Sequence, residues 1–150
     1  MAHFVKGLVA ARPVLERLAR RHALPEPAGL AAGLAILPLR DSDLDSFLKG
    51  PYSGDPEGDY YLSEQFSEEL RAASRGAAIM YFETEYFGGC GAQAAALFQD
   101  GEPIFGPAVA KIGPINEALK LLGVRVEPPA CDEFDTVGLG RHCTVEDWLK

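Results

Sequence analysis

The fold prediction depends most on residues 77–107, which read AAIMYFETEYFGGCGAQAAALFQDGEPIFGP. Residues 77–87 alternate in a way that is typical of a strand, so odd and even positions point to opposite faces of a sheet. Residues 92–99 predict a second strand, and Asp100-Gly101 between two apolar runs is the usual signal for a tight hairpin with positive φ angles. The whole stretch therefore predicts an antiparallel meander.

Cys90 lies between glycines inside this meander and has two interpretations. A nucleophilic cysteine needs a lowered thiol pKa, a base and oxyanion donors, and His142 is the candidate base. A nucleophile elbow, however, places the reactive residue between a strand and a following helix, whereas the residues after Cys90 are predicted to continue as a hairpin. We therefore interpret Gly88, Gly89 and Gly91 as a bulge or turn that joins two antiparallel strands.

Two carboxylates share one face of the predicted strand at residues 77–87. An antiparallel sheet often leaves one face to solvent. Aromatic rings beside charges also suit a protein-binding surface, and paired acids suit general acid–base chemistry or a hard cation. For the recognition interpretation, the predicted contact residues on this face are Tyr81, Glu83, Glu85 and Phe87.

The flanking segments predict further strands and helices around the meander. Residues 2–10 and 33–39 are predicted as strands, and Pro13 suits the first turn of a helix between them. Further helices are predicted at 41–48, 62–76, 112–123 and, capped by Thr144, 144–150, with a loop at 49–61. We predict one α+β domain over residues 1–150, with roughly five strands in a largely antiparallel sheet and four or five helices packed against it.

Charge is distributed unevenly along the 150-residue chain, whose formal net charge is −8. Residues 1–40 carry six basic and two acidic side chains, whereas residues 41–69 carry nine acidic and one basic. Because this acidic density repels phosphate backbones, we predict no direct nucleic-acid binding and expect a partner protein with a basic surface. The alternative is a solvated face. The candidate contact residues in this stretch are Asp55, Glu57 and Asp59.

A second polar concentration lies in CDEFDTVGLGRHCTVEDW, residues 131–148. We expect Arg141 to close back onto Asp135 as a two-pronged ion pair that fixes the loop. The alternative interpretation is a functional patch, whose residues would be Asp132, Glu133, Arg141 and His142.

The cysteines and the apolar runs narrow the class of protein. Three cysteines without CxxC spacing predict neither a disulfide scaffold nor a standard zinc module. No apolar run approaches the ~18 residues that span a bilayer, and no secretory signal is visible. We therefore predict a cytoplasmic protein with no membrane contact, cofactor or metal. The four residues from which a zinc site is conceivable are Cys90, Cys131, His142 and Cys143.

In length, acidity and mixture of strands and helices, the chain resembles the small cytoplasmic immunity proteins that accompany bacterial polymorphic toxins and contact-delivered effectors. The segments that carry this resemblance are YFETEYFGGCGAQAAALFQDGEPIFG, residues 81–106, and DEFDTVGLGRHCTVEDWL, residues 132–149. The resemblance implies a non-catalytic inhibitor that occludes the active site of a toxin, with acidic and aromatic residues in contact.

Two other functions are compatible with these residues. The first is a hydrolase that uses Cys90 with His142, or that uses the pair Glu83 and Glu85. The second is a housekeeping domain that works as a homo-oligomer through an exposed sheet edge. We favour the binding protein over both, and so expect no catalysis.

Overall fold

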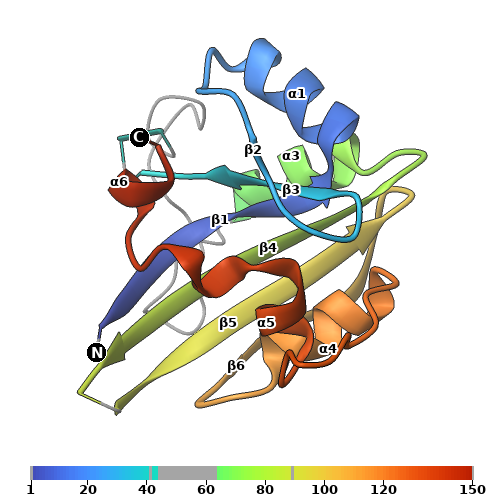
Figure 1. Cartoon of the computed structure of the whole chain (residues 1–150). Helices are drawn as coiled ribbons and strands as arrows, with labels where there is room; N and C mark the ends of the chain where they lie inside the picture. Colours follow the sequence, from blue (N-terminus) through green and yellow to red (C-terminus); the bar gives the residue numbers. More distant parts are fainter. Residues whose placement is uncertain (1, 41, 44–63, 89, 150) are drawn as a thin grey trace.

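The computed structural model describes residues 2–40, 42–43, 64–88 and 90–149. Its centre is a six-stranded antiparallel sheet in the order β2-β3-β1-β4-β5-β6 (Figure 1). The strands are β1 (His3–Ala11), β2 (Ala28–Gly29), β3 (Leu34–Pro38), β4 (Ala78–Phe87), β5 (Cys90–Gln99) and β6 (Glu102–Ala110). The α+β prediction is confirmed. The sheet has six strands rather than about five, because the two-residue β2 has no signal in the sequence.

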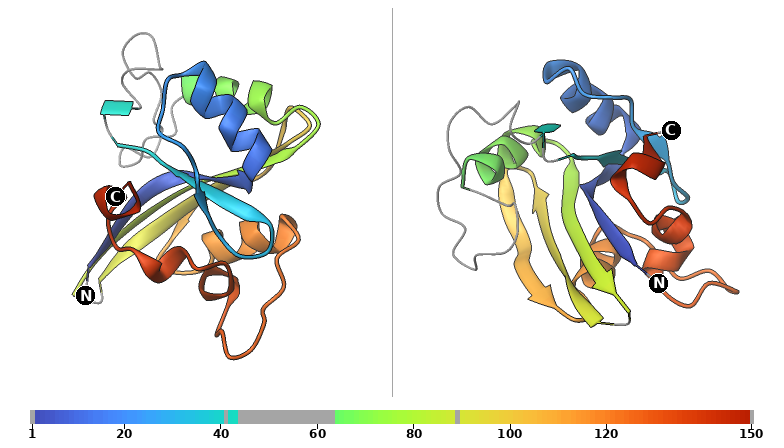
Figure 2. Two further views of the ribbon diagram at one scale, coloured as in Figure 1. Left: turned by 45° about the horizontal axis from the view of Figure 1, so that its top comes forward. Right: turned by 90° about the vertical axis from the view of Figure 1, so that its left-hand side faces the viewer.

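Helices cover both faces of the sheet (Figure 2). On one face lie α1 (Arg12–Arg21) and α3 (Glu64–Ala73), and on the other lie α4 (Pro114–Leu121), α5 (Glu133–Val137), the 3-10 turn η1 (Leu139–Arg141) and α6 (Val145–Trp148). Within the described ranges, no helix is both long and apolar enough to cross a membrane. The helix predicted at 41–48 and the loop predicted at 49–61 lie outside the described residues, apart from residues 42–43.

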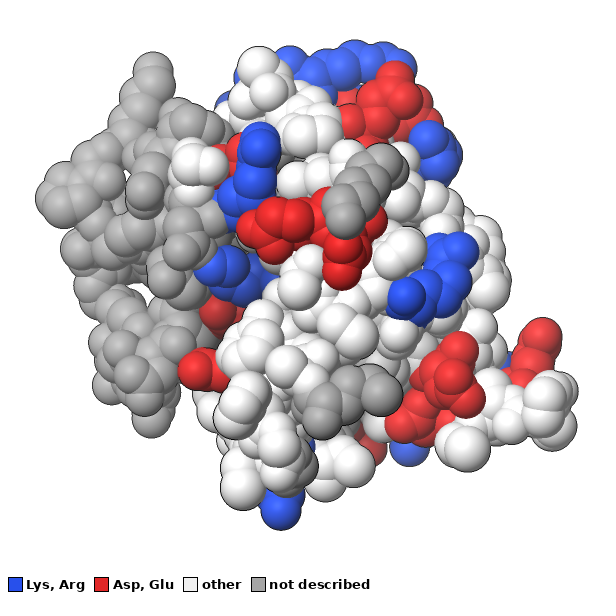
Figure 3. All heavy atoms as spheres, turned by 60° about the vertical axis from the view of Figure 1, so that its left-hand side comes forward, with Lys and Arg blue, Asp and Glu red and all other residues white. Residues whose placement is uncertain are grey.

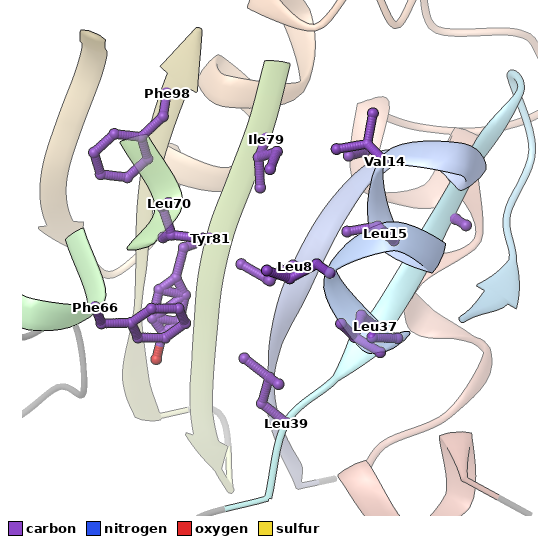
Figure 4. Close-up of a cluster of buried hydrophobic side chains, with 14 of the residues drawn as sticks. Leu8, Val14, Leu15, Leu37, Leu39, Phe66, Leu70, Ile79, Tyr81 and Phe98 are labelled. Carbon is purple, nitrogen blue, oxygen red and sulfur yellow. The ribbon is translucent and has the colours of Figure 1, made fainter. Parts of the chain in front are cut away.

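The core between the sheet and α1 and α3 combines strand and helix side chains from distant parts of the chain (Figure 4). The two helices also touch each other, because His22 Nε2 lies 3.4 Å from Glu69 Oε2. The largest buried side chains of this layer are Leu8, Leu15, Leu37, Leu39, Phe66, Leu70, Ile79, Tyr81 and Phe98.

The opposite core packs β4 and β5 against the C-terminal helices. Met80, Phe82 and Leu97 lie under α4, α5 and α6, and Trp148 is 6% exposed. The predicted alternation of β4 is therefore confirmed: Met80 and Phe82 face this layer, whereas Ile79 packs in the other. Burial on both faces is confined to the first half of β4, since exposed residues begin at Glu85.

Both predicted hairpins are present. Asp100 and Gly101 have φ angles of 52° and 82°, as the tight turn between β5 and β6 requires. At the other turn, Phe87 pairs directly with Cys90, which confirms that the glycine-rich motif is a bend between two strands. Gly91 cannot be replaced without strain: its φ is 143°, and a Cβ atom would stand 1.9 Å from the carbonyl oxygen of Glu85.

A side chain of the sheet positions the start of α4. Gln93 Oε1 accepts a hydrogen bond of 2.8 Å from the backbone N–H of Ile115, one of the N-terminal donors that a helix leaves without an internal partner. Gln93 Nε2 in turn donates to the Tyr86 hydroxyl at 2.9 Å, and that hydroxyl donates to the carbonyl of Lys111. The β4–β5 hairpin and α4 are thereby held together by polar contacts as well as by the core.

Candidate functional site

Tyr81, the first of the contact residues expected on β4, is buried rather than exposed. Its side chain is 2% exposed, and its ring centroid lies 5.1 Å from that of Phe66 in α3. The expectation that Tyr81 contacts a partner is therefore corrected, because α3 covers this part of the strand and places the ring in the core.

The far half of the same strand face is open at the end of the β4–β5 hairpin. Phe87 is 74% exposed and Glu85 is exposed. Glu85 lies directly opposite Phe4 of β1, which is 43% exposed, and Phe87 lies opposite the exposed Cys90. Directly opposed residues of an antiparallel pair point to the same face. Phe4, Glu85, Phe87 and Cys90 therefore form one surface, which we call the hairpin-end patch.

A cross-strand pair of opposite charges lies beside the hairpin-end patch. Glu83 is half-buried, with Lys6 of β1 directly opposite it, so opposite charges face each other across the strands. In Figure 3, uncharged atoms dominate the lower part of the view, toward the end of the molecule where this hairpin turns. Glu85 is thus an exposed carboxylate beside two exposed aromatic rings.

The acidic residues expected to form a patch near the C-terminus have structural partners. Asp132 caps α5: its Oδ1 accepts from the backbone N–H of Asp135 at 2.8 Å, and its Oδ2 accepts from Asn116 Nδ2 at 3.2 Å. Glu133 is 6% exposed, with Lys120 Nζ 3.9 Å from its carboxylate. These contacts hold α5 against α4. Both carboxylates therefore have partners within the chain and need no ligand to stabilise them.

Arg141 does not close onto Asp135, so the expected loop lock is corrected. Its Nη2 donates to the carbonyl of Gly29 at 2.5 Å and its Nε to the carbonyl of Gly138 at 3.3 Å. The Asp135 carboxylate instead accepts from the backbone N–H of Cys131 at 3.0 Å. Because Arg141 follows the left-handed turn at Gly138, its side chain reaches back to β2 rather than to α5.

His142 and Arg141 both lie against Trp148. The guanidinium carbon of Arg141 is 5.2 Å from the Trp148 ring centroid, and the His142 ring meets that indole edge-on at 4.7 Å. A cation over an aromatic face is a stabilising contact. His142 is exposed, but its ring contributes to the seating of α6.

The structure divides the expected contact residues between the two sides of the sheet. Glu83, Glu85 and Phe87 are on the α1 and α3 side, whereas the residues of 132–142 belong to segments that cover the other side. They do not form one surface. Asp55, Glu57 and Asp59 lie outside the described residues.

The hydrolase alternative that uses Cys90 with His142 finds no matching geometry in the described residues, whereas the pair Glu83 and Glu85 stays a prediction. Cys90 begins strand β5 rather than preceding a helix, and no hydrogen bond joins it to His142 in this part of the chain. Over the described ranges, no three His, Cys, Asp or Glu side chains are grouped so that they could hold a metal ion. Cys90 and Cys131 are exposed, and Cys143 is half-buried.

A half-buried polar contact that the sequence did not indicate joins β1 to β4. His3 Nδ1 lies 2.6 Å from Thr84 Oγ1, which also accepts from the backbone N–H of Val5 at 3.0 Å. The His3 ring packs edge-on against Phe134 at 5.7 Å. Burial lowers the pKa of His3, and nearby backbone carbonyls only partly oppose this shift. No local pattern could have found this contact, because 81 residues separate its partners.

Strand β6, one of the two edge strands of the sheet in the described residues, is interrupted by two prolines. Pro103 and Pro107 lack a backbone N–H, and the pairing of β5 with β6 shifts register near Leu97. Both features limit the addition of a further strand. An oligomer in which β6 pairs with a strand of another copy would lack the hydrogen bonds that these two positions would otherwise donate.

Comparison of the chain with protein-family models, with curated proteins and with solved structures finds no match.

Proposed function

We propose that this protein is a non-catalytic protein-binding module, an immunity-type inhibitor that covers the active site of a toxin or effector protein. The observation that carries this proposal is the hairpin-end patch. Two aromatic rings, 43% and 74% exposed, flank a single carboxylate on adjacent strands. Aromatic residues are enriched at the energetic centres of protein interfaces, where they fill pockets on the partner.

The patch suits a partner that presents an apolar pocket beside a basic residue. Glu85 and Phe4 are cross-strand neighbours, so their Cβ atoms are about 5 Å apart. Phe87 follows Glu85 by two residues, about 7 Å along the strand. The three side chains are therefore close enough to enter one pocket together. A stable interface buries about 1,200–2,000 Å² in total, so the patch would be its centre rather than its whole extent.

The Glu85 carboxylate would orient a charged partner on the hairpin-end patch. An exposed charge at an interface mainly steers encounter and sets the salt dependence of association. The chain's formal net charge of −8 acts in the same sense as Glu85, favouring a basic partner. Affinity would then come chiefly from Phe4 and Phe87, and orientation from Glu85.

Capture of partner proteins from an extract of the source organism tests the proposal. Immobilised wild-type protein is expected to retain a protein that Phe87→Ser retains poorly, because loss of an aromatic hot spot costs about 2 kcal/mol, or about thirtyfold in Kd. Ile112→Ser is the matched control, since Ile112 is also 74% exposed but lies beyond β6. Equal retention by both variants, or no retained protein at all, would refute the proposal.

A further inference from the structure

The outward face of α1 is basic in a chain that is otherwise strongly acidic. The helix carries four arginines and one glutamate over its ten residues, and all four arginines are exposed. Figure 3 shows Lys and Arg atoms along the upper edge of the molecule, where α1 lies. The apolar side of the helix is buried, so only this arginine face is available to solvent.

Two of these arginines form ion pairs with Glu16 of the same helix. Glu16 Oε1 lies 3.3 Å from Arg12 Nε, and Glu16 Oε2 lies 3.4 Å from Arg20 Nη2. Arg17 and Arg21 have no ion pair with another described residue. They are one turn apart, and like charges at that spacing destabilise a helix.

Helix electrostatics explain only part of this arrangement. Arg20 and Arg21 lie in the last turn, where cations interact favourably with the helix dipole. Arg17 lies in the middle of the helix, where that effect has faded, and gains nothing from it. Among the described residues, the charge of Arg17 therefore has neither an ion pair nor a dipole interaction, and that of Arg21 has only the helix dipole.

We propose that the Arg17–Arg21 face of α1 binds an acidic protein segment. Guanidinium groups bind carboxylates through two parallel hydrogen bonds. Arginines one turn apart match glutamates one turn apart on an acidic helix, because both pairs have the same spacing of about 6 Å. This surface is positively charged, whereas Glu85 of the hairpin-end patch is negative, and it lies on α1 rather than at the hairpin end. It therefore binds an acidic feature rather than a basic one, and its test is independent of the proposed function.

The charge of the whole molecule favours a protein segment over nucleic acid or a membrane. Because α1 is basic and the chain is at −8, the remainder is even more acidic than the total. A duplex or an anionic bilayer presents a long, continuous negative field that this remainder would repel. An acidic segment about as long as α1, roughly 15 Å, meets the arginines alone, since charges beyond about 10 Å are screened at ordinary salt.

Fluorescence anisotropy with a labelled helical peptide of alanine and glutamate, with glutamates at i and i+4, tests the inference at about 0.1 M salt, where charges beyond about 10 Å are screened. The wild type is expected to bind this peptide more tightly than one of the same composition with scattered glutamates. The variant Arg17→Gln/Arg21→Gln should weaken binding about tenfold, because two exposed ion pairs are lost. It is expected to fold at least as well as the wild type, since a like-charge repulsion is removed.

The variant Lys111→Gln/Arg125→Gln is the charge-matched control. It removes two exposed cations from segments outside α1, and its affinity for the peptide should stay within about twofold of the wild type. Equal weakening by both double variants would mean that net charge alone is responsible and would overturn the inference. Absence of peptide binding by the wild type, or tighter binding to oligothymidylate or to phosphatidylserine vesicles, would overturn it as well.

Discussion

Phe66 and Phe87 are both phenylalanines, but one is buried and the other is exposed. Truncating each side chain tests whether α3 packs over β4. Phe66 is 0% exposed and packs on Tyr81 beneath α3. Phe66→Ala should therefore cost about 3–5 kcal/mol of unfolding free energy, from lost burial and the cavity left behind. A domain of this size has about 5–15 kcal/mol in total. The expected fall in Tm is about 6–20 °C, at 2–4 °C per kcal/mol.

Urea denaturation followed by circular dichroism measures this difference directly. Phe87→Ala is the control, because Phe87 is 74% exposed and its loss should change the unfolding free energy by no more than about 0.5 kcal/mol. If the two variants were equally destabilised, or if Phe66→Ala were silent, α3 would not cover β4. Tyr81 would then be open to a partner on the face of β4.

Three further changes probe the turn between β4 and β5, the half-buried His3 and the cap of α6. Gly91→Ala should cost more than about 1–3 kcal/mol, because backbone strain is joined by a clash with Glu85, whereas Gly29→Ala, with no atom closer than 4.0 Å, should be nearly neutral in urea denaturation. His3 has a lowered pKa in the folded protein, so the unfolded chain takes up the proton first and stability should decline as pH falls below about 6.5. Urea denaturation at several pH values should show a shallower decline in His3→Asn, and an unchanged slope would contradict the assignment. Thr144→Ala removes the acceptor of the Asp147 N–H and should cost about 0.5–2 kcal/mol in the same assay, so a silent variant would contradict the cap.

The elements that the sequence predicted well are those whose signals are local. Asp100-Gly101 has the backbone conformation that its turn needs, Pro114 begins α4, and Thr144 caps α6. Each depends on residues a few positions apart. The strand alternation of residues 77–87 is equally local, and the structure confirms which residues share a face.

The features that the sequence missed depend on which distant segments become neighbours. Tyr81 and Glu83 occupy equivalent positions in the alternation, so their pattern cannot show that α3 covers the one and leaves the other half-exposed. Phe4 joins the hairpin-end patch only because β1 pairs with β4 in one register. Arg141 finds its acceptor in Gly29, 112 residues away, and not in the nearby Asp135.

Growth rescue tests most directly whether the hairpin-end patch inhibits another protein. The product of the gene adjacent to this one would be expressed in a host, alone and with each variant. We expect the adjacent product to arrest growth, the wild type and Ile112→Ser to restore it, and Glu85→Lys combined with Phe87→Ser to leave it arrested. Full rescue by the patch variant, or growth that the adjacent product never impairs, would show that the hairpin-end patch is not an inhibitory surface.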